Sequence, residues 1–167
     1  MGAVKREKWL VLFFFVLAGL GFLLKPEDLD AMVEPVYPSQ VEGAWEYPVR
    51  PGTQDWVDLE STEARREACQ VPQEALEGMD TAALLETALD YPFCADMLAF
   101  DREEDGYSHQ LNHNGALAAL ETRGDRHEVM QARLKDMKNW RDEVGQARSA
   151  ESALQYDCLT IFIQYME

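Results

Sequence analysis

The first feature of the hydrophobic pattern is an unbroken apolar run near the start of the chain. It extends from Trp9 to Leu24, follows the basic stretch at 5–8 and precedes a cluster of acidic residues. A helix over these 16 residues is about 24 Å long and, with Lys25 reaching the headgroups, nearly matches the ~30 Å hydrocarbon core of a bilayer. Positive charge before the run predicts a cytoplasmic N-terminus and an exported body.

The run is either a retained membrane anchor or a cleaved signal peptide. Signal cleavage requires small residues just beyond the apolar run, whereas the pair Gly19 and Gly21 lies inside it. The anchor is therefore the favoured interpretation. Residues 1–25 are expected to be a cytoplasmic tip plus a transmembrane segment of a single-pass cell-membrane protein, and cleavage would instead make the protein secreted.

Residues 26–58 are predicted to be a proline-rich, acidic linker. Proline recurs five times between 26 and 51 without helical or strand periodicity, and proline favours extended backbone. Three aromatic residues interrupt this pattern: Trp45, Tyr47 and Trp56. Their side chains either pack onto the following domain, which is the favoured interpretation, or form an exposed binding surface.

From residue 59 to residue 167 apolar positions recur at helical spacing, and no segment alternates with the period of two that marks a strand. Capping residues and prolines divide this region into segments. Three expected helices cover about 61–69, 72–78 and 81–90. Another begins at Tyr91-Pro92, and another runs from about Tyr107 to Gly124. A long helix begins at Asp125, with Glu128 completing its capping box, and the last helix begins at Ser149. The pattern predicts an all-α domain over 59–167, a compact bundle of about five or six helices preceded by the transmembrane or signal helix and an extended linker.

The last expected helix is apolar on more than one face. A helix of this kind is buried on most sides, so we expect the earlier helices, a second copy or further sequence to cover it. Its apolar residues are Leu154, Cys158, Leu159, Ile161, Phe162 and Ile163.

The chain carries 15 Lys and Arg residues against 31 Asp and Glu residues, a formal net charge of −16. Nucleic acid is therefore not an expected partner, because a phosphate backbone requires a surplus of basic residues. Residues 26–107 hold most of the acidic surplus, with 21 acidic and 4 basic side chains. Such a surface keeps the protein soluble and repels anionic lipid. A solvated acidic face is the favoured interpretation, and attraction of cations or of a basic partner is the alternative.

An acidic stretch before the helix at 107 has the start of a calcium-binding pattern. Asp101, Glu103 and Asp105 precede Gly106 at the spacing of calcium ligands. Position twelve of the pattern is Asn112, which lacks the carboxylate that chelates calcium. A tight turn is therefore the favoured interpretation, with a calcium loop as the alternative.

A pair of histidines follows. His109 and His113 are four residues apart, which places both rings on one helix face, as in many zinc sites. Gln110 stands where a metalloprotease has its base, and an amide cannot take a proton from bound water. A polar helix face is the favoured interpretation, so no cofactor is expected.

Three cysteines, Cys69, Cys94 and Cys158, follow the apolar run. Disulfides persist outside the cell, and an odd number leaves at least one thiol unpaired within the chain. We expect Cys94 and Cys158 to be small core residues, with a Cys69–Cys94 bridge as the alternative. The sequence has no glycine-rich phosphate loop and no G-x-S-x-G elbow, so no catalytic residue is assigned.

A series of matches to a known module runs in consistent order from 48 to about 138. The matching residues are Pro48-Val49-x-Pro51-Gly52-Thr53-x-x-Trp56, Ala68-Cys69-Gln70-Val71-Pro72, Met79-x-Thr81, Leu85-Glu86-Thr87, Tyr91-Pro92, Asp101, Asp105-Gly106 and Asn114-Gly115. With these residues the stretch resembles an uncharacterised module of exported and membrane-anchored proteins of Gram-positive bacteria. The resemblance implies export and an α-helical fold, and it implies no activity.

Together these features predict a membrane-anchored extracytoplasmic α-helical domain with an interaction or structural role. Its expected contacts are the membrane, through the N-terminal helix, and another envelope protein. A cell-envelope hydrolase that uses carboxylates and a cation-binding domain are the alternatives.

Overall fold

The structure, a computed structural model, describes residues 37, 41–144 and 149–166. The chain divides into two compact units, Met1–Pro35 and Val36–Glu167, and every described residue belongs to the second. The apolar run at 9–24 and the first part of the predicted linker lie outside the described residues. Within the described ranges no helix has the length and apolarity needed to cross a membrane.

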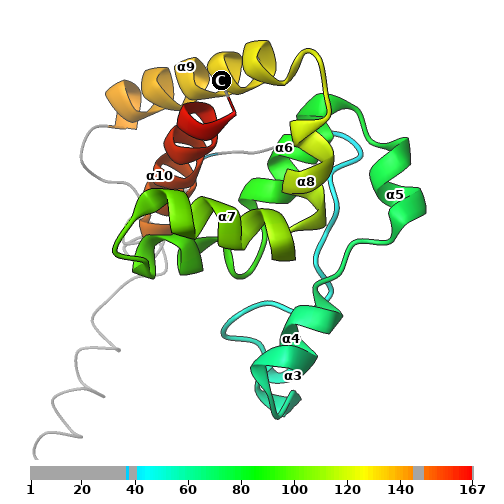
Figure 1. The fold of residues 1–167 in the computed structure, drawn as a ribbon. Coiled ribbons are helices and arrows are strands. Elements are labelled where there is room, and N and C mark those ends of the chain that lie inside the picture. The colour runs from blue at the N-terminus through cyan, green and yellow to red at the C-terminus, as the bar shows by residue number, and fades with distance from the viewer. Residues whose placement is uncertain (1–36, 38–40, 145–148, 167) are drawn as a thin grey trace, which may run out of the picture. The chain divides into compact units, whose positions relative to one another are not determined.

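The described part of the chain is all-helical and contains no strand, which confirms the predicted fold class (Figure 1). Eight elements are α-helices and η1 is a 3-10 helix, so this part holds more helices than the five or six expected. Two of the additional elements arise because a short helix forms inside the predicted linker and because the helix expected over 107–124 is split in two. The elements are α3 (Gln54–Asp58), α4 (Thr62–Ala68), α5 (Gln73–Gly78), α6 (Thr81–Leu89), η1 (Cys94–Ala99), α7 (Glu103–His113), α8 (Gly115–Glu121), α9 (Arg126–Val144) and α10 (Ala150–Tyr165).

Side-chain caps begin three of these helices at positions that the sequence indicates. The side chains of Ser61, Asp80 and Ser149 each accept a hydrogen bond from the backbone N–H three residues further along. Each bond satisfies an N–H group that has no partner within the helix. The starts of α4, α6 and α10 are therefore determined locally.

Asn114 divides the helix expected over 107–124 into α7 and α8. Its side-chain oxygen accepts a hydrogen bond from the Leu117 N–H at 3.2 Å, and its side-chain nitrogen donates to the Ala88 carbonyl of α6 at 3.0 Å. Asn114 thus caps α8 and fixes the break against α6. The break lets α7 pack on η1 and α10 while α8 packs on α6 and α5.

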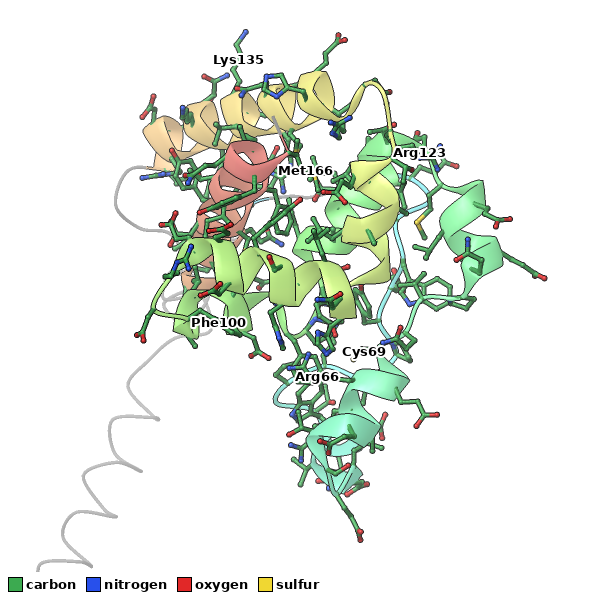
Figure 2. The ribbon with its side chains drawn as sticks, in the orientation of Figure 1. Arg66, Cys69, Phe100, Arg123, Lys135 and Met166 are labelled. Atoms are coloured by element: carbon green, nitrogen blue, oxygen red, sulfur yellow. The ribbon has the colours of Figure 1, made fainter. Side chains whose placement is uncertain are left out.

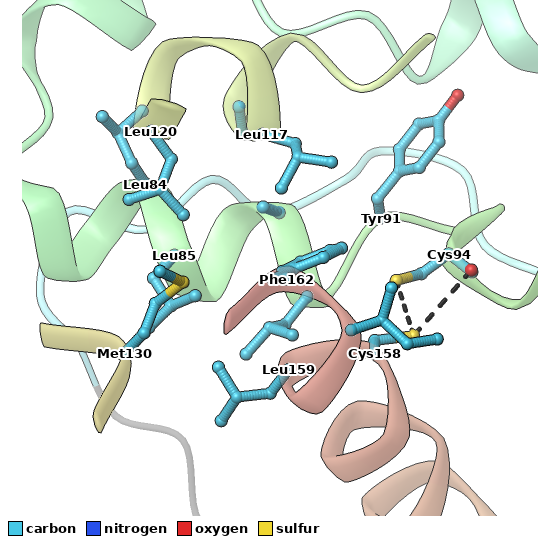
Figure 3. Packing of buried hydrophobic residues seen from close by; sticks show 14 of the residues in the cluster. Leu84, Leu85, Tyr91, Cys94, Leu117, Leu120, Met130, Cys158, Leu159 and Phe162 are labelled. Atoms are coloured by element: carbon cyan, nitrogen blue, oxygen red, sulfur yellow. Dashed lines mark hydrogen bonds between the residues drawn. The ribbon is translucent and has the colours of Figure 1, made fainter. Parts of the chain in front are cut away.

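Helix α6 is the central element of this unit. Eight of its nine residues are buried, and it contacts α8, α9 and α10. A helix buried on nearly every side needs an apolar surface all round, which the run of alanine and leucine in α6 provides. Figure 3 shows the core at α6, where Leu84 and Leu85 of this helix belong to one cluster with Leu117, Leu120, Met130, Leu159 and Phe162.

Earlier helices of the same chain bury α10. Cys158, Leu159 and Phe162 are fully buried, and Ile161 and Ile163 are nearly so. The covering elements are α6, α7, α9 and η1. These apolar residues therefore need neither a second copy nor further sequence to cover them.

The segment 41–53, which the sequence assigns to the linker, lies against α6. The backbone N–H of Trp45 donates to Thr87 Oγ1 at 2.9 Å, and the Tyr47 hydroxyl donates to the Thr87 carbonyl at 3.0 Å. The Tyr47 ring also packs on Tyr91, with ring centres 5.8 Å apart. This segment therefore packs within the helical unit and brings Arg50 to the C-terminal end of α6.

Candidate functional site

The three aromatic residues considered as a binding surface do not share one exposed face. Tyr47 is buried, whereas Trp45 and Trp56 are partly buried. The Trp56 ring packs on Phe93 at a centre-to-centre distance of 5.1 Å, and the Arg65 guanidinium lies 5.5 Å from its centre. Burial raises the pKa of the Tyr47 hydroxyl far above its ordinary value. These side chains hold the segment before α4 onto the unit.

The acidic residues considered as calcium ligands are exposed. Glu103 and Asp105 lie in the first turn of α7 rather than in a loop, and Asp101 precedes that turn. Arg102 lies 4.0 Å from Asp105, and Glu103 accepts a hydrogen bond from Gln164 of α10 at 3.4 Å. Acidic side chains in a first turn are favourable because they face the positive end of the helix dipole. In the part of the chain that the structure describes, no three His, Cys, Asp or Glu side chains are grouped to hold a metal ion.

The histidine pair forms a cluster that joins three helices. The rings of His109 and His113 are 4.3 Å apart, and His113 Nδ1 donates to the His109 carbonyl at 2.8 Å. Arg66 of α4 places one guanidinium nitrogen 3.4 Å from His109 Nε2 and donates to Asp96 of η1 at 2.7 Å (Figure 2). Burial, His113 and Arg66 lower the pKa of His109, and Asp96 opposes this effect. A guanidinium beside the ring nitrogen disfavours a metal cation there.

The strongest candidate for a binding site is a cleft of about 330 Å³ at the C-terminal end of α6. It lies where segment 50–51, the chain after α6 and the first turns of α10 meet. Concave sites that combine apolar walls with a few placed polar groups are the usual places for ligands. We name it the α6–α10 cleft; its lining residues are Arg50, Pro51, Leu89, Asp90, Tyr91, Pro92, Glu151, Leu154 and Gln155.

An ion pair forms part of the wall of the α6–α10 cleft. Arg50 Nη1 donates to Asp90 Oδ1 at 2.9 Å, and Nη2 donates to the other carboxylate oxygen. The hydrogen bond to Asp90 raises the pKa of Arg50, and the carboxylate of Glu151 acts in the same direction. Since the charges of Arg50 and Asp90 cancel, Glu151 gives the cleft a net negative charge.

Gln155 lines the cleft and carries a buried hydrogen-bond acceptor. Its side chain is 7% exposed, and its Oε1 atom is buried without a hydrogen-bond partner among the described residues. An unsatisfied buried polar atom costs about 1–3 kcal/mol. A ligand that enters the cleft, turns the Gln155 amide towards itself and donates a hydrogen bond to Oε1 would remove this cost.

Two other hollows have less to offer a ligand. A groove of about 500 Å³ lies between α5 and α8. Its α8 side consists of the small residues Gly115, Ala118 and Ala119, and its Arg123 side chain already donates to the Met79 carbonyl at 2.9 Å. A hollow of about 390 Å³ beside Trp45 contains one buried donor without a partner among the described residues, the indole N–H. The α6–α10 cleft combines charge, a buried acceptor and apolar walls, and it is therefore the candidate site.

Comparisons with protein-family models, with curated proteins and with solved structures find no match to this chain. The fold and the cleft by themselves define the class of protein, which is an all-helical domain with a negatively charged cleft. No sequence motif marks Arg50, Asp90, Glu151 or Gln155 as site residues. These residues come from three distant segments, and no local spacing links them.

Proposed function

We propose that this chain is a membrane-anchored domain, held outside the cytoplasmic membrane, that binds a basic segment of another envelope protein in the α6–α10 cleft. The apolar run at 9–24 supports the anchor, and the basic residues before it support a cytoplasmic N-terminus.

The single observation that carries the binding proposal is the joint presence of Gln155, Glu151 and apolar walls in one cleft. A Lys or Arg side chain has an apolar stem and a cationic head that donates hydrogen bonds and accepts none. Leu89 and Leu154 offer apolar surface to the stem. Gln155 Oε1 and the Glu151 carboxylate are suitable acceptors for the head.

The charge of the whole chain supports the same kind of partner. A formal net charge of −16 attracts a basic segment over distances comparable to the Debye length and speeds its encounter with the cleft. Charge alone gives little selectivity, because exposed ion pairs contribute about 0.2–1 kcal/mol each. Selectivity would come from the buried acceptor of Gln155.

A peptide-binding experiment on the full chain in detergent micelles tests this proposal. The probe is a fluorescent lysine-rich peptide, and the readout is anisotropy at a fixed salt concentration. Hydrogen bonds to charged groups contribute about 1.5–3 kcal/mol, so Glu151→Gln and Gln155→Met should each weaken binding by about tenfold or more.

Asp157→Asn is the matched control, because Asp157 is an exposed carboxylate on the same helix. It removes the same charge as Glu151→Gln and should weaken binding by less than about threefold. Equal losses for Glu151→Gln and Asp157→Asn, with no loss for the uncharged change Gln155→Met, would mean that the peptide senses only the overall charge, which would refute binding in the cleft.

Photo-crosslinking on intact cells identifies the natural partner. A photoreactive residue in place of Leu154 lies in the cleft, and the same residue in place of the exposed Thr160 lies elsewhere on α10. We expect one envelope protein to be captured from position 154 and lost with Glu151→Gln. Equal capture from both positions would contradict the proposal.

A second candidate is a cell-envelope hydrolase, because the cleft is lined by the two carboxylates of Asp90 and Glu151. Carboxylate pairs carry acid–base and nucleophilic steps in glycoside hydrolysis. If this candidate holds, the full chain releases reducing ends from cell-wall polysaccharide, and Asp90→Asn and Glu151→Gln each abolish the release. No release, or release that both variants retain, excludes it.

A further inference from the structure

The thiols of Cys94 and Cys158 lie in direct contact in the core (Figure 3). Their sulfur atoms are 2.9 Å apart, and the Cys158 thiol also lies 3.8 Å from the Cys94 carbonyl, to which it donates. A disulfide bond has a sulfur–sulfur distance of about 2.05 Å. The two sulfurs therefore need to approach by only about 0.9 Å to become bonded.

Surrounding helices hold this contact in place. Cys94 is the first residue of η1, and Cys158 lies 64 positions later, within α10. The side-chain amide of Gln110, from α7, donates to the carbonyls of Phe93 at 2.7 Å and of Cys94 at 3.4 Å. The start of η1 is thus fixed against α7 on one side and against α10 on the other.

Cys69 takes no part in this contact. Its side chain is buried at the end of α4, and its thiol donates to the Val49 carbonyl at 3.8 Å. The Cys69–Cys94 bridge, which the sequence left as an alternative, is therefore not the pair that the structure brings together.

We propose that Cys94 and Cys158 form an intrachain disulfide that links η1 to α10, while Cys69 stays a thiol. The oxidant is a disulfide compound, such as oxidised glutathione or an oxidised thiol–disulfide oxidoreductase. One cysteine attacks the oxidant, forms a mixed disulfide and releases one thiol; the other cysteine then displaces the second thiol. The pair loses two electrons and two protons, and the oxidant takes up both as it becomes two thiols.

Burial determines when this exchange takes place. Both side chains are inaccessible in the folded unit, Cys94 at 2% exposure and Cys158 at 0%. The hydrogen bond to Cys158 and burial raise the pKa of the Cys94 thiol, and a thiol with a raised pKa reacts slowly because it holds little thiolate. Exchange therefore belongs to the folding reaction, before α10 covers η1, and the finished bond is shielded from reductants.

Oxidative refolding of the full chain tests the proposal. The reduced, denatured protein is refolded in detergent micelles with a mixture of reduced and oxidised glutathione, and the reaction is stopped with acid. The product is unfolded and treated with N-ethylmaleimide, and its intact mass and proteolytic peptides are measured. We expect one maleimide adduct, on Cys69, and one linked peptide pair that contains Cys94 and Cys158.

Cys69→Ser is the matched control, and it should retain the linked pair and take up no maleimide. Three adducts on the wild-type chain, or a linked pair that contains Cys69, would overturn the proposal. The experiment needs neither the α6–α10 cleft nor the membrane location, so its outcome is independent of the proposed function.

Discussion

Replacing Arg133 with Met removes the guanidinium that pairs with Glu86 between α9 and α6. The two side chains are 8% and 6% exposed, so the pair lies in the interior. Two guanidinium nitrogens of Arg133 donate to the carboxylate, one of them at 3.1 Å, and the guanidinium carbon lies 3.8 Å from the centre of the Tyr37 ring. The substitution therefore removes two charge-assisted hydrogen bonds and a cation–π contact together.

The expected loss follows from the buried ion pair that is broken. Breaking a buried ion pair by removing one partner costs about 3–5 kcal/mol, because the interior carboxylate loses the charge-assisted hydrogen bonds from the guanidinium. The cation–π contact contributes about 1 kcal/mol more, and the methionine side chain recovers part of the apolar packing. We expect Arg133→Met to lower the free energy of unfolding by about 3–5 kcal/mol.

Guanidinium denaturation of the full chain measures this loss. Tryptophan fluorescence and far-ultraviolet circular dichroism should give coincident transitions, as a two-state analysis requires. Lys135→Met, an exposed change on the same helix (Figure 2), is the control and should alter stability by less than about 0.5 kcal/mol. The double variant Glu86→Leu with Arg133→Met should recover most of the loss, because an apolar pair can replace a buried ion pair at little cost.

Two results would refute this reasoning. A loss below about 1 kcal/mol for Arg133→Met would mean that water or another group readily compensates the carboxylate. A double variant as unstable as the single variant would mean that packing, rather than the broken ion pair, accounts for the loss.

Three further predictions concern other parts of the unit. Oxidation of the Cys94–Cys158 pair should raise the free energy of unfolding by about 4 kcal/mol, because it closes a loop of 64 positions. Denaturation with and without reductant measures this change. Equal free energies of unfolding in the two conditions would contradict the chain-entropy argument. Gly106→Ala should destabilise the unit by about 1–3 kcal/mol, because a β-carbon there overlaps a backbone carbonyl of η1, whereas Gly124→Ala, with open space around it, should be near neutral in thermal melting. His109 has a pKa below 6.5 in the folded state, so the unfolded chain binds the proton more readily as the pH falls. The free energy of unfolding should therefore decrease as the pH drops from 6.5 through the folded pKa. Nuclear magnetic resonance titration checks the pKa, and the His109→Gln variant should lose this pH dependence of stability.

Much of the helical structure could be predicted from short-range features. The polar caps at Ser61, Asp80 and Ser149 act on N–H groups only three residues away, so sequence spacing is sufficient to locate them. The break at Asn114 was missed because asparagine also occurs within helices, and its role depends on the α6 carbonyl that it contacts. The sequence predicts a tight turn in the acidic stretch that ends at Gly106, yet α7 already begins at Glu103.

The candidate site could not be predicted in the same way. Arg50 and Asp90 are 40 positions apart, and Glu151 and Gln155 follow on a helix still further along the chain. Each residue has an ordinary local context, so no motif marks it. Only the acidic charge of the chain, visible in the composition, indicated the kind of partner that the cleft suits.

The sequence by itself determined that this part of the chain is helical, where its main helices begin, and that α10 must be covered on several sides. These properties follow from periodicity and from hydrogen bonds between near neighbours. The tertiary structure decided which helices cover α10, which cysteines touch, and which charges are buried together. Those outcomes depend on contacts between residues 40 or more positions apart, and local preferences place no constraint on how such distant segments meet.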